Sequence, residues 1–247
     1  MLKILLLISI VSNIYASTIT VAIASNIIYA LPELKKEFYK IHPNIKIREI
    51  ISGSAKLTAQ IKHNAPFDIF MSANMKYPNS LYTDGFTINK PKIYAKGKLA
   101  LLSYKKYDYS NIYKLLKNNK IKKIAIANPK LAPYGKASEQ YLKNIKIYEN
   151  IKYKFVYAQS ISQTLLYTLN ACDIGIVALS SLKSTKLKEY KENINYIKLD
   201  TKLYTPISQG IVILKKAKKN NNAKVFYEFI LSKKAKKIFL KYGYDVL

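Results

Sequence analysis

The chain has 247 residues, of which 49% are apolar and 23% are charged, which is the composition of a folded globular protein and not of a disordered one. Its formal net charge of +28 suggests a nucleic-acid-binding protein at first sight, but almost every basic residue is a lysine and Arg48 is the only arginine. Arginine is the preferred residue for bidentate contacts with phosphates and bases. We therefore interpret the charge as solvated surface and expect no nucleic-acid partner.

The residues that carry most catalytic and metal chemistry are scarce. Cys172 is the only cysteine, which excludes an internal disulfide and a zinc site built from cysteines. His42 and His63 lie far apart without metal-ligand spacing, so we expect no bound metal cation and no cofactor. We find no set of nucleophile, base and acid, so a hydrolase is disfavoured and a binding protein is expected, not an enzyme.

Residues 1–16, MLKILLLISIVSNIYA, have the pattern of a signal peptide. Lys3 provides the positive start, residues 4–11 form the apolar segment, and Ala16 is the expected last residue before cleavage. The apolar segment is too short to span a bilayer, although a retained N-terminal anchor is the alternative. We therefore expect an exported, soluble mature chain.

The first structural unit is a short apolar strand over residues 18–23, followed by Ser25 and Asn26 and then by a helix that runs to Ile41. Ser and Asn are favoured N-caps, because their side-chain oxygens accept hydrogen bonds from the free backbone N–H groups of a helix start. Such a helix start also attracts anions. Pro32 should bend this helix or loosen its first turn. We call such a strand, small polar turn and helix an elbow.

Three more elbows follow along the chain. The second joins a strand over 44–50, the turn Ser52-Gly53-Ser54 and a helix over 55–63. The third joins a strand over 121–127 to a helix that Pro133 opens, with Tyr134 at its tip and Gly135 allowing the backbone to approach a ligand. The fourth joins a strand over 154–157, a turn over 159–162 and a helix to residue 170. Further strands are predicted over 69–72, 98–104, 173–179 and 204–214, and closing helices over 225–242.

Strands that alternate with helices predict parallel βαβ units, whose ligands lie at the carboxyl edge of the sheet. Discontinuities near 94–98 and 204–209 suggest two lobes that are joined by two crossing strands. The predicted first lobe comprises residues 17–95 with 206–247, and the predicted second lobe comprises 96–205. The predicted fold class is therefore α/β, with a mainly parallel sheet flanked by helices in each lobe.

An ordered set of motifs resembles one known family. The motifs are ASNIIYALPELKKEF, SGSAKLTAQIKHNAPFDIFMSA, LAPYGKASEQYL, ISQTLLYTLNACDIGIVALS and AKKIFLKYGY. In this set and order they resemble the periplasmic molybdate-binding proteins of ABC importers, which are two-lobed type II substrate-binding proteins. The resemblance implies a periplasmic monomer that captures molybdate or tungstate and delivers it to a membrane permease.

The resemblance also implies the ligand-binding residues. Members of this family hold a tetrahedral dianion with hydroxyls and backbone N–H groups at helix starts, without a countercharge. The matching positions here are Ser25, Asn26, Ser54, Tyr134 and Ile161. Some members donate a tyrosine hydroxyl from the strand that ends in GIVA, but this chain has Ala178 there. Whether Tyr134 acts through its hydroxyl or its N–H is left open.

Three alternatives remain at this point. Lys56 and Lys136 follow two of the elbows and would give the anion a countercharge if their side chains pointed inward. The same fold would also serve sulfate, phosphate or a small organic anion. A more distant alternative is a basic exported protein that binds polyanions.

Overall fold

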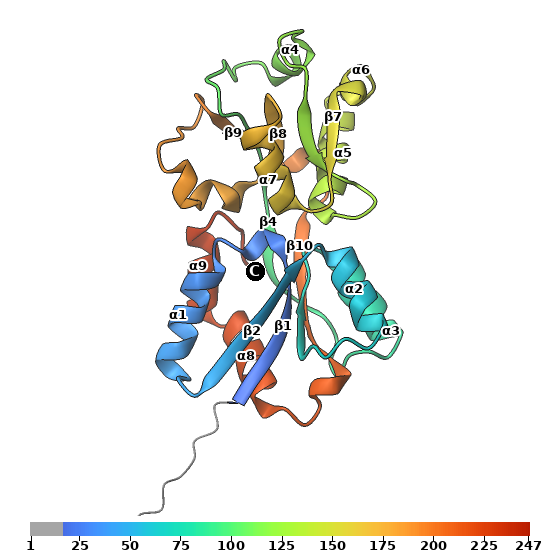
Figure 1. Ribbon diagram of the computed structural model, residues 1–247, viewed down its shortest axis with the longest axis vertical. Helices are drawn as coiled ribbons and strands as arrows, with labels where there is room; N and C mark the ends of the chain where they lie inside the picture. The colour runs from blue at the N-terminus through green and yellow to red at the C-terminus, as the bar shows by residue number, and fades with distance from the viewer. Residues whose placement is uncertain (1–16) are drawn as a thin grey trace, which may run out of the picture.

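The computed structural model describes residues 17–247, and the predicted signal peptide lies outside the described residues. The chain forms two lobes that are stacked along the long axis of the molecule, each built on a five-stranded sheet (Figure 1). Within residues 17–247, none of the helices combines the length and the apolar character that a bilayer crossing requires.

The first lobe contains both ends of the described chain. The strand order of its sheet is β2-β1-β3-β10-β4, with β1, β2 and β3 parallel and β10 antiparallel to β3 and β4. The strands are β1 (Ser17–Ala24), β2 (Ile45–Ser52), β3 (Ile69–Met71), β4 (Lys92–Gly97) and β10 (Ile207–Ile213). The helices of this lobe are α1 (Leu31–Ile41), α2 (Ser54–Lys62), α3 (Lys76–Thr83), α8 (Asn221–Leu231) and α9 (Lys233–Lys241).

The second sheet repeats this arrangement with the order β7-β6-β8-β5-β9. Its strands are β5 (Leu99–Leu102), β6 (Ile124–Ala127), β7 (Phe155–Ala158), β8 (Ile174–Ala178) and β9 (Tyr196–Lys198). Strands β6, β7 and β8 are parallel, and β5 runs antiparallel between β8 and β9. The helices are α4 (Ile112–Lys117), α5 (Pro133–Asn144), α6 (Tyr148–Ile151) and α7 (Ile161–Asn170). In each sheet four of the five strands thus run in one direction, and the predicted fold class is confirmed.

Short 3-10 helices of three to five residues complete the fold. They are η1 (Ser25–Ile27), η2 (Lys152–Lys154), η3 (Leu179–Lys183), η4 (Thr185–Leu187), η5 (Thr201–Leu203) and η6 (Lys215–Ala217).

The lobes are connected where β4 and β10 run side by side (Figure 1). Only Lys98 separates β4 from β5, and Gly97 at the end of β4 pairs with Ile207 at the start of β10. The Tyr204 hydroxyl accepts a hydrogen bond from the backbone N–H of Leu99 at 3.1 Å. The connection from β4 to β5 and the return connection into β10 therefore lie next to each other.

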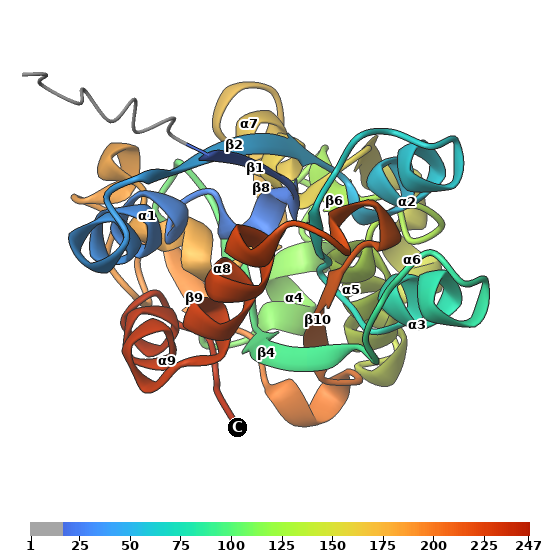
Figure 2. The ribbon, with the colours of Figure 1, turned by 90° about the horizontal axis from the view of Figure 1, so that it is seen from below.

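Helices cover both faces of the first sheet. Figure 2 shows α1, α8 and α9 on one side and α2 and α3 on the other. Phe38 of α1 packs edge-on against Phe226 of α8, with ring centroids 5.0 Å apart. Leu57 and Leu81 fill the opposite face. A sheet covered on both faces has apolar strands without alternation, which is the pattern of β3 and β10, whereas the edge strand β2 alternates between buried and exposed residues in its first half.

The first predicted helix begins later than expected. Ser25 and Asn26 lie in η1, whose N-cap is Ala24 and which has no side-chain cap, and α1 starts only at Leu31. Pro32 explains the break, because a proline lacks the backbone N–H and its ring clashes with the carbonyl four residues earlier. Proline is tolerated only in the first turn, so α1 cannot extend back to Ser25.

Gly135 allows α5 to pack directly on the end of β6. A β-carbon at this position would lie 2.2 Å from the carbonyl oxygen of Ala127 and 2.7 Å from its carbon. The close approach that this glycine permits is therefore to the backbone of β6, whereas the sequence suggested an approach to a ligand.

We predict that Gly135→Ala lowers the free energy of unfolding by about 1–3 kcal/mol, since overpacking against backbone outweighs the helix propensity gained from alanine. Urea denaturation of the purified chain measures this change. Lys136→Ala, at the next and exposed position of α5, is the control and should change stability by less than about 0.5 kcal/mol. Equal stability of the two variants would contradict the packing argument.

Glu37 of α1 connects two helices of the first lobe. Lys234 of α9 lies 2.7 Å from its carboxylate and Lys40 lies 2.6 Å from it. These hydrogen bonds lower the pKa of Glu37 from 4.5 to about 2, and the bond from Lys234 has the larger effect.

A depressed carboxyl pKa contributes stability above the ordinary value of 4.5, and this contribution is lost as the pH falls towards 2. We therefore expect Glu37→Gln to lower the melting temperature at pH 7 in low salt, and the difference from the wild type to shrink as the solution is acidified. Glu228→Gln is the control, because the Glu228 carboxylate lies 4.0 Å from Lys224 in an exposed pair. A difference that grows with acidification would refute the prediction.

Candidate functional site

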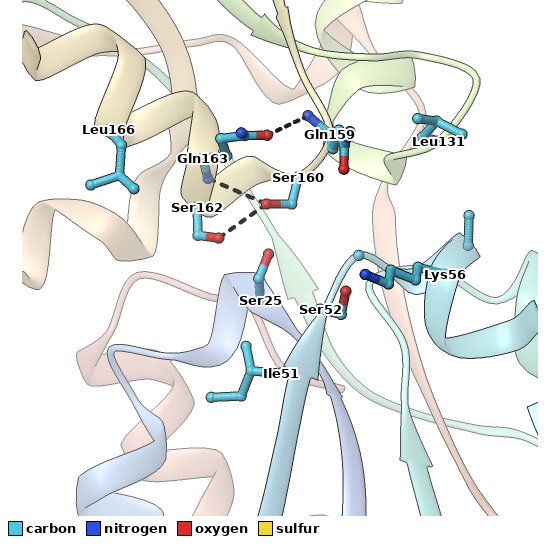
Figure 3. Close-up of a pocket in the computed structure, with 12 residues that line it drawn as sticks. Ser25, Ile51, Ser52, Lys56, Leu131, Gln159, Ser160, Ser162, Gln163 and Leu166 are labelled. Atoms are coloured by element: carbon cyan, nitrogen blue, oxygen red, sulfur yellow. Dashed lines mark hydrogen bonds between the residues drawn. The ribbon is translucent and has the colours of Figure 1, made fainter. Parts of the chain in front are cut away.

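A cavity of about 370 Å³ lies between the two lobes, where the carboxyl ends of β1 and β2 face the segments after β6 and β7 (Figure 3). The lining residues come from all four elbow regions: Ser25, Ile51, Ser52, Gly53, Ala55, Lys56, Leu131, Gln159, Ser160, Ser162, Gln163 and Leu166. Parallel neighbours end at the same edge of a sheet, so β1 with β2 and β6 with β7 bring their turns together. No acidic side chain is among the lining residues.

The first elbow contributes Ser25 and Asn26. Ser25 lines the cavity, and its hydroxyl makes no hydrogen bond to another described residue (Figure 3). Asn26 is almost fully buried, and its Nδ2 donates to Oε1 of Gln209 at 2.9 Å, with a longer contact of 3.4 Å to the Tyr244 hydroxyl. Its Oδ1 is buried without a partner in the described part of the chain. An amide oxygen only accepts hydrogen bonds, so a water, and not a fully ionised oxyanion, would complete its bonding.

The carbonyl of Asn26 is held from two sides. The Tyr244 hydroxyl donates to it at 2.7 Å and the Ser180 hydroxyl at 3.1 Å. Tyr244 belongs to the C-terminal segment of the first lobe, whereas Ser180 lies in η3 after β8 of the second sheet, so the Ser180 bond joins the two lobes at the first elbow.

The second elbow places Ser54 at the first position of α2, after the N-cap Gly53. Ser54 is 1% exposed, and its hydroxyl oxygen accepts from the backbone N–H of Ala73 at 3.0 Å. The hydrogen of this hydroxyl is therefore free for another acceptor. Its neighbours Gly53 and Ala55 line the cavity.

The third elbow places Tyr134 at the second position of α5, with 1% exposure. Its hydroxyl oxygen accepts from Nε2 of Gln209 at 3.0 Å, and no described residue accepts the hydroxyl hydrogen. Burial, with a smaller contribution from Tyr244, raises the pKa of the Tyr134 hydroxyl well above its usual value of 10.0. The group is therefore a permanent O–H donor.

The fourth elbow places Ile161 at the start of α7, where Ser160 is the N-cap. The Ser160 hydroxyl accepts from the backbone N–H of Gln163 at 3.3 Å and lies 3.1 Å from the Ser162 hydroxyl (Figure 3). The N–H groups of Ile161 and Ser162 precede the first hydrogen bond of the helix, so they have no intrahelical acceptor.

The two lobes contact each other beside the cavity. A β-carbon on Gly53 would lie 3.3 Å from the carbonyl oxygen of Gln159 and 4.0 Å from Cβ of Ser160. The Tyr77 hydroxyl also donates to the carbonyl of Leu131 at 3.5 Å. Both contacts join a residue of the first lobe to one of the second.

The two candidate lysines differ in their surroundings. Lys136 pairs with Glu139 at 3.1 Å on the surface of α5, whereas Lys56 lines the cavity and makes no ion pair with a described residue. Lys56 therefore remains available as a countercharge. Ala178, at the position where some members of the family have a tyrosine, has no side-chain donor, and its carbonyl accepts from the Ser181 hydroxyl at 2.6 Å.

Sequence reasoning missed Gln209 as a partner of Asn26 and Tyr134. The available signal was a glutamine inside the apolar strand ISQGIVI, where a buried amide requires hydrogen-bond partners. Across residues 17–247, no three His, Cys, Asp or Glu residues lie close enough together to hold a metal ion.

Comparison with known proteins agrees with this geometry. A family model described as bacterial extracellular solute-binding protein matches residues 19–245. The chain is 34% identical to the molybdate-binding protein ModA of Azotobacter vinelandii over 94% of this chain and 91% of that protein. It is 31% identical to the putative ABC transporter substrate-binding lipoprotein YvgL of Bacillus subtilis (strain 168) over 92% of this chain and 86% of that protein.

Among solved structures, the Azotobacter vinelandii periplasmic molybdate-binding protein superposes with a TM-score of 0.84 at 31% identity, covering 93% of this chain and 99% of that one. The match of the family model extends through both lobes and both connections between them. The chain therefore belongs to the family of bacterial extracellular solute-binding proteins, whose members bind and deliver solutes and are not enzymes.

Proposed function

We propose that this protein captures molybdate, or tungstate, for an ABC importer. The observation that carries the proposal is the convergence of four strand-to-helix turns on one cavity that no acidic side chain lines. The ligands of the oxyanion are Ser25, Asn26, Ser54, Tyr134 and Ile161, which act as neutral hydrogen-bond donors. The similarity to molybdate-binding proteins over nearly the whole chain supports molybdate as the anion.

A buried dianion loses its hydration shell, so the protein must supply donors in return. Hydrogen bonds to a charged acceptor are about twice as strong as neutral ones, so a set of hydroxyl and N–H groups suffices. The hydroxyls of Ser54 and Tyr134 each have a hydrogen that no described residue accepts, and Ser25 has an unbonded hydroxyl at the cavity wall. These groups are therefore available for an anion without breaking a bond.

The proposed function also includes the location of the protein, its delivery of the anion and its closure. We infer that the protein is a monomer in the periplasm after removal of residues 1–16, and that it delivers the oxyanion to a membrane permease. Residues 17–95 with 206–247 act as one lobe and residues 96–205 as the other. They close over the ligand by a hinge motion at the crossing of β4 and β10.

Ligand-induced stabilisation tests the choice of anion. Molybdate and tungstate at about 100 times their Kd should raise the melting temperature by about 5–10 °C, because a ligand that binds only the folded state stabilises it by mass action. Sulfate and phosphate at the same concentrations are the comparison and should give smaller shifts. A larger shift with sulfate or phosphate favours the alternative ligand, and the absence of a shift with molybdate and tungstate rejects the proposal.

Single substitutions test whether neutral donors hold the anion. Ser54→Ala should weaken molybdate binding about 10- to 100-fold in calorimetry, because it removes a hydrogen bond to a charged acceptor. Lys56→Gln should weaken it less than about 3-fold, since a lysine exposed at the cavity wall is screened by solvent. Ser103→Ala is the control for a buried hydroxyl, because Ser103 is fully buried and donates to the Asp173 carbonyl away from the cavity. A larger loss from Lys56→Gln than from Ser54→Ala would indicate a countercharge and not a neutral site.

A further inference from the structure

Gln209 is a fully buried polar residue in β10, at the place where the two lobes are connected. It pairs with Ala95 of β4, and the pairing register shifts between Gln209 and Gly210. A buried amide without partners is costly, so its contacts reveal what the position requires.

The amide of Gln209 bonds to residues from both lobes. Its Oε1 accepts from Nδ2 of Asn26 at 2.9 Å and from the Tyr94 hydroxyl at 2.8 Å. Its Nε2 donates to the Tyr134 hydroxyl at 3.0 Å. Gln209 therefore contacts the side chains of the first and the third elbow at once.

These contacts determine where the hydrogens of the two partners go. Asn26 must present its nitrogen to Gln209, and its second N–H hydrogen has only the 3.4 Å contact with the Tyr244 hydroxyl. Tyr134 receives a hydrogen bond from Gln209, so its own hydrogen is not used there. With the amide of Gln209 reversed, Tyr134 would donate to Oε1 and Asn26 would present its oxygen, and the tyrosine hydrogen would be consumed inside the protein.

The surroundings hold this arrangement in place. A β-carbon at Gly97 would lie 2.0 Å from the Tyr134 hydroxyl and 2.8 Å from Nε2 of Gln209, so the contact exists only because residue 97 has no side chain. Tyr94, which donates to Oε1, is itself buried, and burial raises the pKa of its hydroxyl well above 10.0. Tyr94 thus remains a donor, and its hydroxyl has two acceptors within reach, Oε1 of Gln209 at 2.8 Å and the carbonyl of Ser72 at 3.3 Å.

We propose that Gln209 is a positioning residue for the oxyanion site: it holds Asn26 and Tyr134, from opposite lobes, in place and leaves the Tyr134 hydroxyl with a hydrogen for the ligand. This inference rests on the proposed function, because it assigns Gln209 a role towards the same anion. Gln209, Asn26 and Tyr134 lie behind the cavity wall and are not among the residues that line it.

Calorimetric titration of the mature chain with sodium molybdate tests the role. Gln209→Met keeps the length of the side chain but removes both hydrogen-bonding ends, and we expect binding about 10- to 100-fold weaker than in the wild type. Tyr109→Phe is the control for the loss of a buried polar contact, because the Tyr109 hydroxyl donates to the Asn195 carbonyl within the second lobe. It should bind molybdate within about 2-fold of the wild type.

A second comparison separates positioning from general destabilisation. In the Asn26→Ala/Tyr134→Phe background, Gln209→Met should cost less than about 3-fold further, because the groups that it orients are gone. An equal loss in both backgrounds, or wild-type affinity of Gln209→Met, overturns the inference. If Gln209→Met does not fold, Gln209→Glu decides: a carboxylate only accepts, so it consumes the Tyr134 hydrogen and should weaken binding at least about 10-fold. Wild-type affinity of that variant overturns the inference.

The two proposals fail in different ways. A wild-type chain that releases no heat with molybdate or tungstate rejects the proposed function and the role of Gln209 with it. A wild type that binds, together with a Gln209→Met variant that binds equally well, rejects the role of Gln209 alone.

Discussion

The hydrogen bonds at Asn26 are the constraint on which the rest of the structure depends. The backbone carbonyl of this residue accepts from the C-terminal segment through Tyr244 and from the second lobe through Ser180. Its side chain donates to Gln209 in the strand that connects the lobes. Buried polar groups must be paired, so these contacts require the first elbow, the crossing and the second lobe to meet in one arrangement. The cavity between the lobes is a consequence of that arrangement.

The large positive charge of the surface and the neutral donors proposed for the cavity act at different stages of anion binding. Many lysines form exposed ion pairs, such as Lys241 with Glu33 and Lys62 with Asp84, which contribute little stability individually. The net charge of +28 creates a field that raises the encounter rate with small anions. Once an anion is bound, selection by size depends on donors at defined positions, which hydroxyls and helix starts provide with less mobility than a lysine side chain.

Much of the fold could be predicted because strand and helix patterns are local. Residues 18–23, 154–157 and 173–179 were predicted as strands and lie in or overlap β1, β7 and β8. The helix predicted directly after Ser25 and Asn26 begins only at Leu31, because Pro32 restricts α1 to residues from Leu31 onward. The strand predicted over 121–127 is shorter, with β6 beginning at Ile124. Short elements such as β9 and α4 were not predicted, since three to six residues have too little periodicity to be distinguished from loops.

The sequence by itself determined the α/β class, the two lobes and the positions of four polar turns, because these follow from periodicity and from the residues that end helices and strands. Only the tertiary structure decided which polar groups meet. Ser25 lines the cavity directly, whereas the Tyr134 hydroxyl bonds to Gln209, a residue 75 positions away in the chain. Such pairings depend on sheet order and on the absence of a side chain at Gly97, neither of which has a local signature.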